Sequence, residues 1–289
     1  METVLQLLAS GLSLGFIYCL VAIEYSLLFN TCGLLNFGHE KYITLGAYVF
    51  VGTAVLQLGL GTIPSMGVAL LIMAAVGVCI ALLVFIPLRK FSRLYSALGT
   101  LALSMMVREG IRLIWGSYPF TYHGYLTGVV KFGGITLPRV YCYIISISIV
   151  ILVAQNLLFH YTKVGKGVRA VSQDKDTAAL MGINVKFVIA FSAALSMMIC
   201  CITAFFTIPL LGININMSST IGTKGFVAGV IGGFGNLNGA ILGGLIVGLL
   251  ESLYLICGFP ALYKDIMVFA LFILILLFKP NGILNRKPA

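Results

Sequence analysis

The sequence predicts an all-α fold, a polytopic bundle of transmembrane helices that forms one membrane domain over residues 1–289. Three observations predict it: 60% of the residues are apolar, only 9% are charged, and the apolar residues gather in long runs. A soluble chain usually carries roughly a quarter charged residues. The 18 basic and 8 acidic side chains are therefore too few to coat a soluble fold of this length.

Eight apolar runs are candidates for membrane spans, because a helix needs about 20 apolar residues to cross roughly 30 Å of hydrocarbon. The runs are 4–29, 38–58, 63–86, 94–115, 140–160, 187–210, a part of 226–257, and 261–278. The first run has no Lys or Arg before it, whereas a signal peptide begins with a basic region. We therefore expect it to be kept as the first span.

The stretch 226–257 needs a more complex arrangement than one span. Its 32 residues would make a helix of about 48 Å, which is too long for one crossing even with tilt. Its first part is rich in glycine, which predicts a short broken helix near 224–234, a turn at 235–238 and a full span from Gly239. Broken helices occur where protein buries them or where they line a cavity. Gly232, Gly233 and Gly235 are therefore candidates for a substrate pathway.

Glycines repeat at every fourth position in the same region, as in Gly235, Gly239 and Gly243 and again in Gly244 and Gly248. This spacing lets helix backbones approach closely. It is compatible with tight packing inside one subunit and with a dimer interface. No repeat relating one half of the chain to the other is found.

Basic residues mark the cytoplasmic side of a membrane protein when they lie in short loops. Here they form three groups, which are Arg89, Lys90 and Arg93; Lys163, Lys166, Arg169, Lys175 and Lys186; and Lys279, Arg286 and Lys287. This distribution predicts an external N-terminus. The net charge of +10 reports orientation, and no nucleic-acid partner is expected, since such a partner requires basic residues clustered on one solvated face.

The most hydrophilic segment, 161–186, lies on the predicted cytoplasmic side. Asp176 is expected to cap a helical turn over 177–181, and Gly182 is expected to end it in the left-handed conformation. Val168 and Val171 would share one face of a preceding short helix. Ala178, Leu180 and Met181 would then be available to a partner, although an ordinary connecting loop is the alternative.

Several charged residues fall inside predicted spans, where each ionised group costs about 2.5–3.5 kcal/mol at the bilayer centre. They are Glu24, Arg108, Glu109, Arg112 and Glu251. Arg108 and Arg112 lie one helical turn apart near the outer end of their span, which favours a role as anchors. Glu24 is the better functional candidate, because its apolar run continues on both sides.

The sequence lacks the common motifs for nucleotide hydrolysis and for metal-dependent catalysis. It contains no G-x4-G-K-[ST] motif and no H-E-x-x-H motif, and its three histidines lie far apart. The seven cysteines are scattered, mostly within apolar runs, and are interpreted as small apolar residues. We expect no catalytic residue, no metal and no cofactor in this chain, so any use of ATP requires a partner.

Segment 161–186 resembles the cytoplasmic coupling segment of permease subunits of branched-chain amino acid ABC importers. The family pattern is close to T-x-x-G-x-x-x-R-A-V-x-x-D-x3-A-x-x-x-G-I-N, and the matching residues are Thr162, Gly165, Arg169, Ala170, Val171, Asp174, Ala178, Gly182, Ile183 and Asn184. Further agreements are Gly11 to Gly15, Asn36-Phe37, Pro87-Leu88-Arg89 and Phe226 to Glu251. The short length is more similar to the H-type permease than to its M-type partner.

The resemblance implies a single transmembrane permease domain in the bacterial inner membrane. It also implies a homologous second permease subunit, two ABC ATPase subunits that bind ATP and Mg²⁺, and an extracytoplasmic solute-binding protein. The ATPases would dock on the coupling segment and drive alternating access. The coupling residues that the resemblance implies are Gly165, Arg169, Ala170, Asp174, Ala178, Met181, Gly182 and Asn184.

Two departures from the family pattern leave the substrate open. Gly38-His39-Glu40-Lys41 stands where the family usually has Ala-His-Gly-Glu, and Glu24 replaces a residue that is usually small. Glu24 and Lys41 could pair with each other or contact a polar substrate, and with Asn36 they are candidates for the pathway. Urea, short amides and other amino acids are alternatives to a branched-chain substrate.

Two other classes of function remain open. An ion- or proton-coupled secondary transporter would use charged groups within the spans, and Glu24, Arg108 and Glu109 are the candidates for it. A membrane adaptor without transport is the third class.

Overall fold

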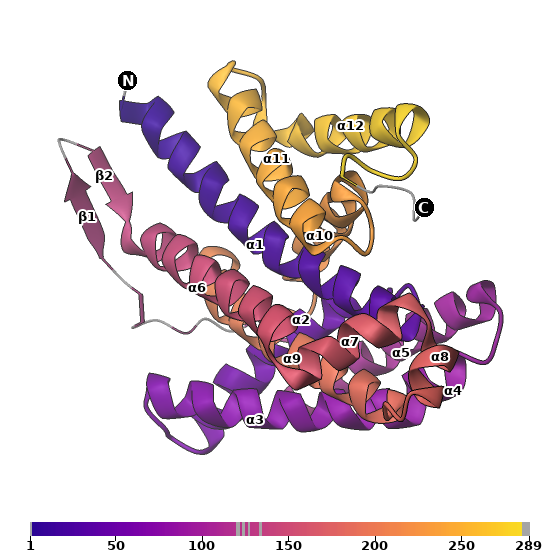
Figure 1. Ribbon diagram of the computed structural model, residues 1–289. Helices are drawn as coiled ribbons and strands as arrows, with labels where there is room; N and C mark the ends of the chain where they lie inside the picture. The colour runs from indigo at the N-terminus through magenta and orange to yellow at the C-terminus, as the bar shows by residue number, and fades with distance from the viewer. Residues whose placement is uncertain (1, 120–121, 123–124, 127, 133–134, 285–289) are drawn as a thin grey trace. The chain divides into compact units, whose positions relative to one another are not determined.

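The structure is a computed structural model that describes residues 2–119, 122, 125–126, 128–132 and 135–284 (Figure 1). Helices dominate it, which confirms the predicted all-α class. The α-helices are α1 (Glu2–Cys32), α2 (His39–Ala47), α3 (Thr62–Ile80), α4 (Ile86–Leu88), α5 (Arg93–Trp115), α6 (Arg139–Tyr161), α7 (Lys163–Gln173), α8 (Lys175–Leu180), α9 (Val185–Leu211), α10 (Ser219–Gly232), α11 (Leu237–Ile256) and α12 (Lys264–Phe278). Two π-helical segments, η1 (Tyr48–Gln57) and η2 (Ala81–Phe85), and a 3-10 turn, η3 (Ala261–Tyr263), complete the helical parts.

Six helices of the described chain are long and apolar enough to cross a membrane. They are Val4–Cys32, Thr62–Leu88, Arg139–Tyr161, Val185–Leu211, Leu237–Ile256 and Ala261–Phe278. The other two predicted spans are helical as well, but they are not among the six. One consists of α2 followed by η1, two short pieces of 9 and 10 residues. The other is α5, which carries Arg93, Arg108, Glu109 and Arg112.

A small hairpin is a departure from the all-α prediction. Strands β1 (Val129–Phe132) and β2 (Ile135–Pro138) pair antiparallel, with Val129 opposite Pro138, in the loop expected between α5 and α6. β-Branched and aromatic residues favour such a pair. The strands escape a hydropathy analysis because each has only four residues.

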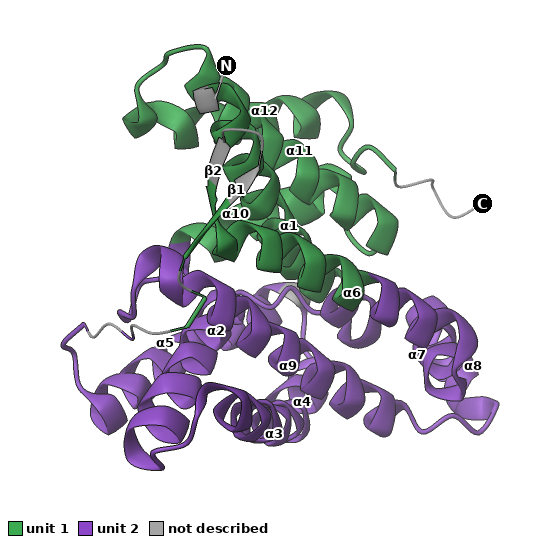
Figure 2. Ribbon diagram, turned by 90° about the vertical axis from the view of Figure 1, so that its left-hand side faces the viewer, with its two compact units in different colours: residues 1–26, 124–152, 220–289 green, residues 27–123, 153–219 purple. Residues whose placement is uncertain are grey.

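The described chain divides into two compact units (Figure 2). Unit 1 comprises Met1–Ser26, Gly124–Leu152 and Thr220–Ala289, and unit 2 comprises Leu27–His123 and Val153–Ser219. Three of the four boundaries fall inside α1, α6 and α10, so continuous helices connect the units at these points of the chain.

Unit 1 is built on close contacts between glycines. A methyl group added at Gly248 of α11 would lie 2.3 Å from the Cα atom of Gly15 in α1. A methyl group at Gly232 of α10 would lie 1.9 Å from the carbonyl oxygen of Gly239 in α11. The repeated glycines of α11 therefore serve packing against α1 and α10 within the subunit, which is one of the two roles their spacing allowed.

In unit 2, α9 packs against both α2 and α3. Small residues make this possible: a methyl group at Gly77 of α3 would lie 2.7 Å from the carbonyl oxygen of Ala193, and one at Gly46 of α2 would lie 2.8 Å from the Cα atom of Cys201. Most of the apolar stretch of α9 is buried as a result. This helix is the centre of the unit.

The broken helix predicted near 224–234 exists as α10, which begins five residues earlier than expected and ends at Gly232. Gly233 and Gly235 adopt φ angles of +106° and +90°, and Asn236 caps α11 by accepting hydrogen bonds from the amides of Asn238 and Gly239. The predicted turn at 235–238 is thus largely confirmed, although α11 begins at Leu237 rather than Gly239.

The chain beyond α12 returns to the end of α10. The amides of Ile283 and Leu284 donate to the carbonyl oxygens of Ile231 and Gly232, at 2.9 and 3.2 Å. The carboxamide of Asn236 donates to the carbonyl oxygen of Leu284 at 3.1 Å. Carbonyl groups at the end of a helix have no partner within it, so these bonds complete the C-terminus of α10.

One arrangement occurs twice along the chain. α1 is followed by Gly33, with a φ angle of +76°, then by the irregular segment 34–38 and the short helix α2. α9 is followed by Gly212, with a φ angle of +69°, then by the irregular segment 213–218 and the short helix α10. The sequence shows no such repeat, because the two halves share a backbone conformation here and not a pattern of residues.

Candidate functional site

Segment 161–186 folds into two short helices, α7 and α8, each with its own N-terminal cap. The hydroxyl of Thr162 accepts a hydrogen bond from the Gly165 amide at 3.0 Å, which begins α7. The carboxylate of Asp174 accepts from the amides of Asp176 and Thr177 at 2.8 and 3.1 Å, which begins α8. The prediction that Asp176 is the cap is therefore wrong, because α8 starts at Lys175 and places Asp176 in its first turn.

Other expectations for this segment are confirmed. Gly182 has a φ angle of +83° after α8, and Val168 and Val171 are both buried on one side of α7. Leu180 and Met181 are 88% and 79% exposed, so they are available to a partner as expected.

Ala178 is a correction, because only 4% of it is exposed and it is not available to a partner. The chain turns back onto α8 at this point, since the Ile183 amide donates to the Ala178 carbonyl oxygen at 3.0 Å. Gly165 is also structural: a methyl group there would lie 2.2 Å from the carbonyl oxygen of Leu158 at the end of α6.

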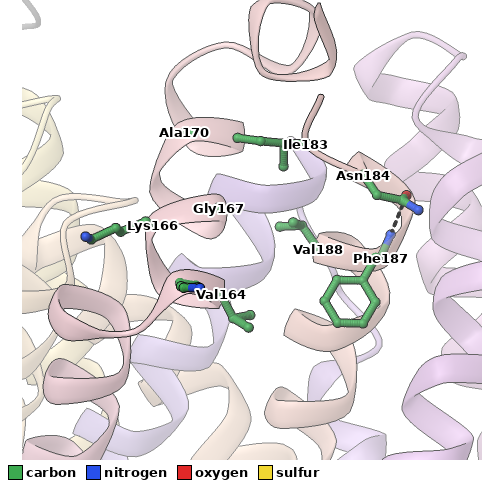
Figure 3. Close-up of a pocket in the computed structure, with 9 residues that line it drawn as sticks. Val164, Lys166, Gly167, Ala170, Ile183, Asn184, Phe187 and Val188 are labelled. Carbon is green, nitrogen blue, oxygen red and sulfur yellow. Dashed lines mark hydrogen bonds between the residues drawn. The ribbon is translucent and has the colours of Figure 1, made fainter. Parts of the chain in front are cut away.

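A groove of about 480 Å³ lies between α7 and the start of α9 (Figure 3). Ala170, Ile183 and Val188 give it an apolar lining, and Lys163 and Lys166 lie at its edge. Asn184, another predicted coupling residue, caps α9 by accepting from the Phe187 amide at 3.1 Å, as the dashed line in Figure 3 shows. The groove and the exposed Leu180 and Met181 give this segment an apolar surface, and its role in docking stays a prediction.

Three charged side chains of segment 161–186 make hydrogen bonds to nearby backbone groups. The guanidinium of Arg169 is exposed and donates to the His160 carbonyl oxygen at 3.4 Å. Hydrogen bonds from Thr177 and Asp176 lower the pKa of Asp174 below its usual value. Lys175 donates to the carbonyl oxygen of Cys32 at 2.7 Å, and burial lowers its pKa. The segment is thereby fastened to the end of α1.

The charges predicted in α5 lie on its surface. Arg112 pairs with Glu109 at 3.0 Å, with 46% and 54% of the two side chains exposed, and it also donates to the Ser117 hydroxyl at 3.2 Å. Arg108 is exposed on the same helix. Their role as anchors stays a prediction.

Glu251 is buried and belongs to a charge cluster that sequence reasoning missed. The ammonium of Lys224 in α10 lies 2.5 Å from Glu251 in α11 and 2.6 Å from Asp265 in α12, and the Tyr18 hydroxyl donates to Glu251 at 3.3 Å. All four residues belong to unit 1. One signal was available, because Lys224 is the only charged residue between Lys186 and Glu251.

The residues proposed for the pathway are divided between the two units. Glu24 is 1% exposed and belongs to unit 1, whereas Lys41 and Asn36 belong to unit 2, so a Glu24–Lys41 pair stays a prediction. Lys41 lies 3.2 Å from the neighbouring carboxylate of Glu40. Gly232 and Gly233 pack closely against Gly239 and Gly282.

Within the described residues, no group of three His, Cys, Asp or Glu side chains is placed to hold a metal ion. The cysteines are free: Cys19, Cys32, Cys200 and Cys201 are buried, while Cys79, Cys142 and Cys257 are exposed.

Comparison with known proteins identifies the family of this helical membrane domain. Residues 7–276 match the family described as branched-chain amino acid transport system / permease component. The chain belongs to this family. The match covers both the coupling segment and the cluster around Lys224.

Relatives in the permease family are similar over nearly their whole length. The chain is 30% identical to the high-affinity branched-chain amino acid transport system permease protein BraD of Pseudomonas aeruginosa, covering 98% of this chain and 96% of BraD. It is equally similar to LivH of Escherichia coli, a protein of the same description, with the same coverage. A probable branched-chain amino acid transport permease protein of Methanocaldococcus jannaschii is 25% identical. No solved structure matches the chain.

Proposed function

We propose that this chain is the H-type permease subunit of an ATP-binding-cassette importer for branched-chain or related amino acids. It is a multi-pass protein of the inner membrane. Full-length similarity to BraD and LivH carries the proposal, since their names describe permeases of branched-chain amino acid transport. The chain is a transport subunit, and ATP and Mg²⁺ would bind to its partners.

The coupling surface supports a role for an ATPase partner. Leu180, Met181 and the groove beside Ala170 expose apolar surface next to Arg169, Lys163 and Lys166. An exposed apolar patch rimmed by charge is typical of a protein interface. A movement of the docked ATPase would pass through the capped helices α7 and α8 to α9, which starts at Val185 directly after the surface.

We also propose eight spans, with α10 as a short additional crossing element. α10 has 14 residues and a length of about 21 Å, so it needs the preceding segment 212–218 to return the chain across the membrane. With this return, the three basic groups all fall on one side, opposite the N-terminus. Eight simple crossings without this return would leave the basic C-terminus on the external side, which the distribution of basic residues disfavours.

The proposed partners are a second permease of the same family, two ATPases and a solute-binding protein. The decisive test is to express the chain with candidate partner subunits, purify the complex by a tag on this chain and measure ATP-dependent uptake in liposomes. Arg169→Glu is expected to weaken ATPase binding by reversing an exposed charge of the docking surface. Lys279→Met, at an exposed lysine after α12, is the control.

Absence of ATPases from the purified complex, together with normal uptake by the Arg169→Glu variant, would contradict the proposal. The second candidate is an ion- or proton-coupled transporter, which the buried cluster of Lys224, Glu251 and Asp265 favours. Uptake that survives removal of ATP but stops on collapse of the membrane potential would identify it. An importer for urea or short amides would show ATP-dependent uptake of those solutes instead.

A further inference from the structure

The start of α2 contacts the residues that lead into α10 at a polar cluster in unit 2. Ser218, the last residue before α10, donates through its hydroxyl to the carbonyl oxygen of Glu40 in the first turn of α2. The same hydroxyl contacts the hydroxyl of Thr44. Lys41 donates to the hydroxyl of Ser219 at 3.1 Å. The start of α2 is therefore joined to the residues that lead into α10.

The cluster contains an ion pair between a buried lysine and a partly exposed glutamate. The ammonium of Lys41 lies 3.2 Å from the carboxylate of Glu40, and their side chains are 8% and 26% exposed. Buried charges are costly in a membrane protein and usually mark a pathway or a binding site. Glu40 retains enough exposure for a ligand to reach the pair.

Two buried polar side chains belong to the same stretch of chain as the pair: the Tyr42 hydroxyl is hydrogen-bonded to the side chain of Asn36, and both residues are almost fully buried. Asn36 is 4% exposed and its Oδ1 atom accepts from the Gly38 amide at 3.1 Å, so its carboxamide lies at the N-terminus of α2. A methyl group at Gly38 would lie 2.9 Å from the Tyr42 hydroxyl and 3.2 Å from Asn36 Oδ1. Polar side chains buried in a membrane domain commonly line a substrate pathway.

We propose that Glu40, Lys41, Asn36 and Tyr42 form a subsite that binds the charged groups of an amino acid during its passage. The substrate carboxylate takes the place of Glu40 on Lys41 and accepts hydrogen bonds from Asn36 and Tyr42. The substrate ammonium binds the released carboxylate of Glu40. This inference rests on the proposed importer function and names the part of the substrate that the permease recognises.

Charge balance favours a zwitterion over the other solutes considered. Glu40 and Lys41 sum to zero charge, and so do the two charged groups of an amino acid, so exchange leaves no charge unpaired. A solute with a carboxylate alone would strand the Glu40 carboxylate, and an unpaired buried charge is strongly unfavourable. Urea or a short amide carries no charge and would leave the ion pair closed.

The test uses the complete complex in liposomes, with radiolabelled leucine as the probe, and measures both leucine uptake and ATP hydrolysis. Lys41→Met and Glu40→Gln are expected to lower the leucine moved per ATP about tenfold or more, because one strong hydrogen-bonded pair is lost. ATP hydrolysis and the yield of complex are expected to stay within about twofold of the wild type. Lys279→Met is the control, with unchanged uptake.

The double variant Glu40→Lys/Lys41→Glu separates a binding role from a structural one. It keeps an ion pair but exchanges its ends, so a structural pair would regain normal uptake while a substrate subsite would not. Normal uptake in this double variant, or in both single variants, overturns the subsite. If Lys41→Met does not assemble, Tyr42→Phe decides, because it removes the hydroxyl and keeps the ring: reduced uptake supports the subsite and normal uptake overturns it.

Different results would contradict the subsite and the importer function. A wild-type complex that binds no ATPase, or that moves no solute with ATP, contradicts the importer itself. A wild-type complex with ATP-dependent leucine uptake that all the variants retain contradicts the subsite alone.

Discussion

Lys224 is a buried ammonium group shared between two carboxylates of different exposure. Its side chain is 2% exposed, that of Glu251 is 3% exposed, and that of Asp265 is 46% exposed. The loss of one partner of a buried ion pair costs about 3–5 kcal/mol, because the other charge stays buried and unpaired. Removing the Lys224–Glu251 pair should therefore change the free energy of unfolding much more than removing the Lys224–Asp265 pair.

Lys224→Met is expected to destabilise the protein by about 3–5 kcal/mol, because it leaves the Glu251 carboxylate buried without its cation. Thermal unfolding of the detergent-purified chain, followed by size-exclusion chromatography, measures the change. Asp265→Asn should have a smaller effect, since Asp265 is partly solvated.

The double variant Lys224→Met/Glu251→Gln is expected to recover most of the lost stability, because it removes both buried charges. Lys264→Met provides a lysine control at the start of α12. Equal melting temperatures for Lys224→Met and Lys264→Met would show that the cluster does not stabilise the fold.

Asp174 gives the coupling segment a dependence on pH. Hydrogen bonds in the folded chain lower its pKa, so the cap is complete above the unfolded pKa of about 3.9 and is lost as the pH falls through the lower folded value. Hydrogen exchange of the amides of Asp176 and Thr177, corrected for intrinsic rates, should therefore accelerate only below about pH 4.

Asp174→Asn keeps a capping side chain that does not titrate, so its amides should stay protected through the same acid range. Asp174→Ala should expose them at every pH. Identical pH profiles for wild type and Asp174→Asn would rule out the carboxylate as the source of the effect.

At the scale of elements, the contact between α1 and α11 depends on the absence of side chains. Gly248→Ala would place a methyl group 2.3 Å from the Cα atom of Gly15, so the helices must separate. Overpacking of this kind costs about 1–3 kcal/mol. A lower unfolding temperature and a lower yield of folded protein are the expected results.

Gly67→Ala in α3 is the matched control, because no atom lies within 4 Å of the added methyl group. Alanine also favours a helix over glycine, by roughly 0.5–1 kcal/mol. Its unfolding temperature should equal or exceed that of the wild type. A similar loss in both variants would mean that the glycine contacts are not responsible.

The coupling helices were predictable from sequence because caps and C-terminal glycines act locally. The error lay between Asp174 and Asp176, which are both suitable caps only two residues apart. The extended backbone of Asp174, with φ of −151° and ψ of 119°, decides between them. The π-helical form of η1 could not be predicted, since its apolar composition is equally typical of an α-helix.

At the scale of the whole molecule, hydropathy predicted the membrane domain but not its charge pairs. Glu251 was recognised as a buried charge, but Lys224 lies 27 residues before it and becomes its partner only when α10 folds back on α11. The cluster of Lys41 with Ser219 is even less local in sequence. Local patterns identify charged residues, whereas tertiary structure decides which of them meet.

The proposed sidedness can be tested with native cysteines. Cys257 is exposed in the turn after α11, on the side predicted to be external. In a Cys79→Ser/Cys142→Ser background, a membrane-impermeant thiol reagent should label Cys257 in spheroplasts without permeabilisation.

Ser172→Cys reports on the other side, because Ser172 is an exposed residue of α7. With Cys257 also replaced by serine, labelling of this variant should require permeabilisation. Labelling of both positions from the same side would contradict the return of the chain through α10.

The closure of the C-terminal segment onto α10 has a mechanical consequence. α10 is held near its start by the Lys224–Asp265 pair and at its end by the amides of Ile283 and Leu284. α12 joins these two attachments and buries only 6% of its apolar stretch within the subunit. We therefore expect α10 and α12 to move together, so that a tilt of the exposed helix in a thicker or thinner bilayer would be passed to the short one.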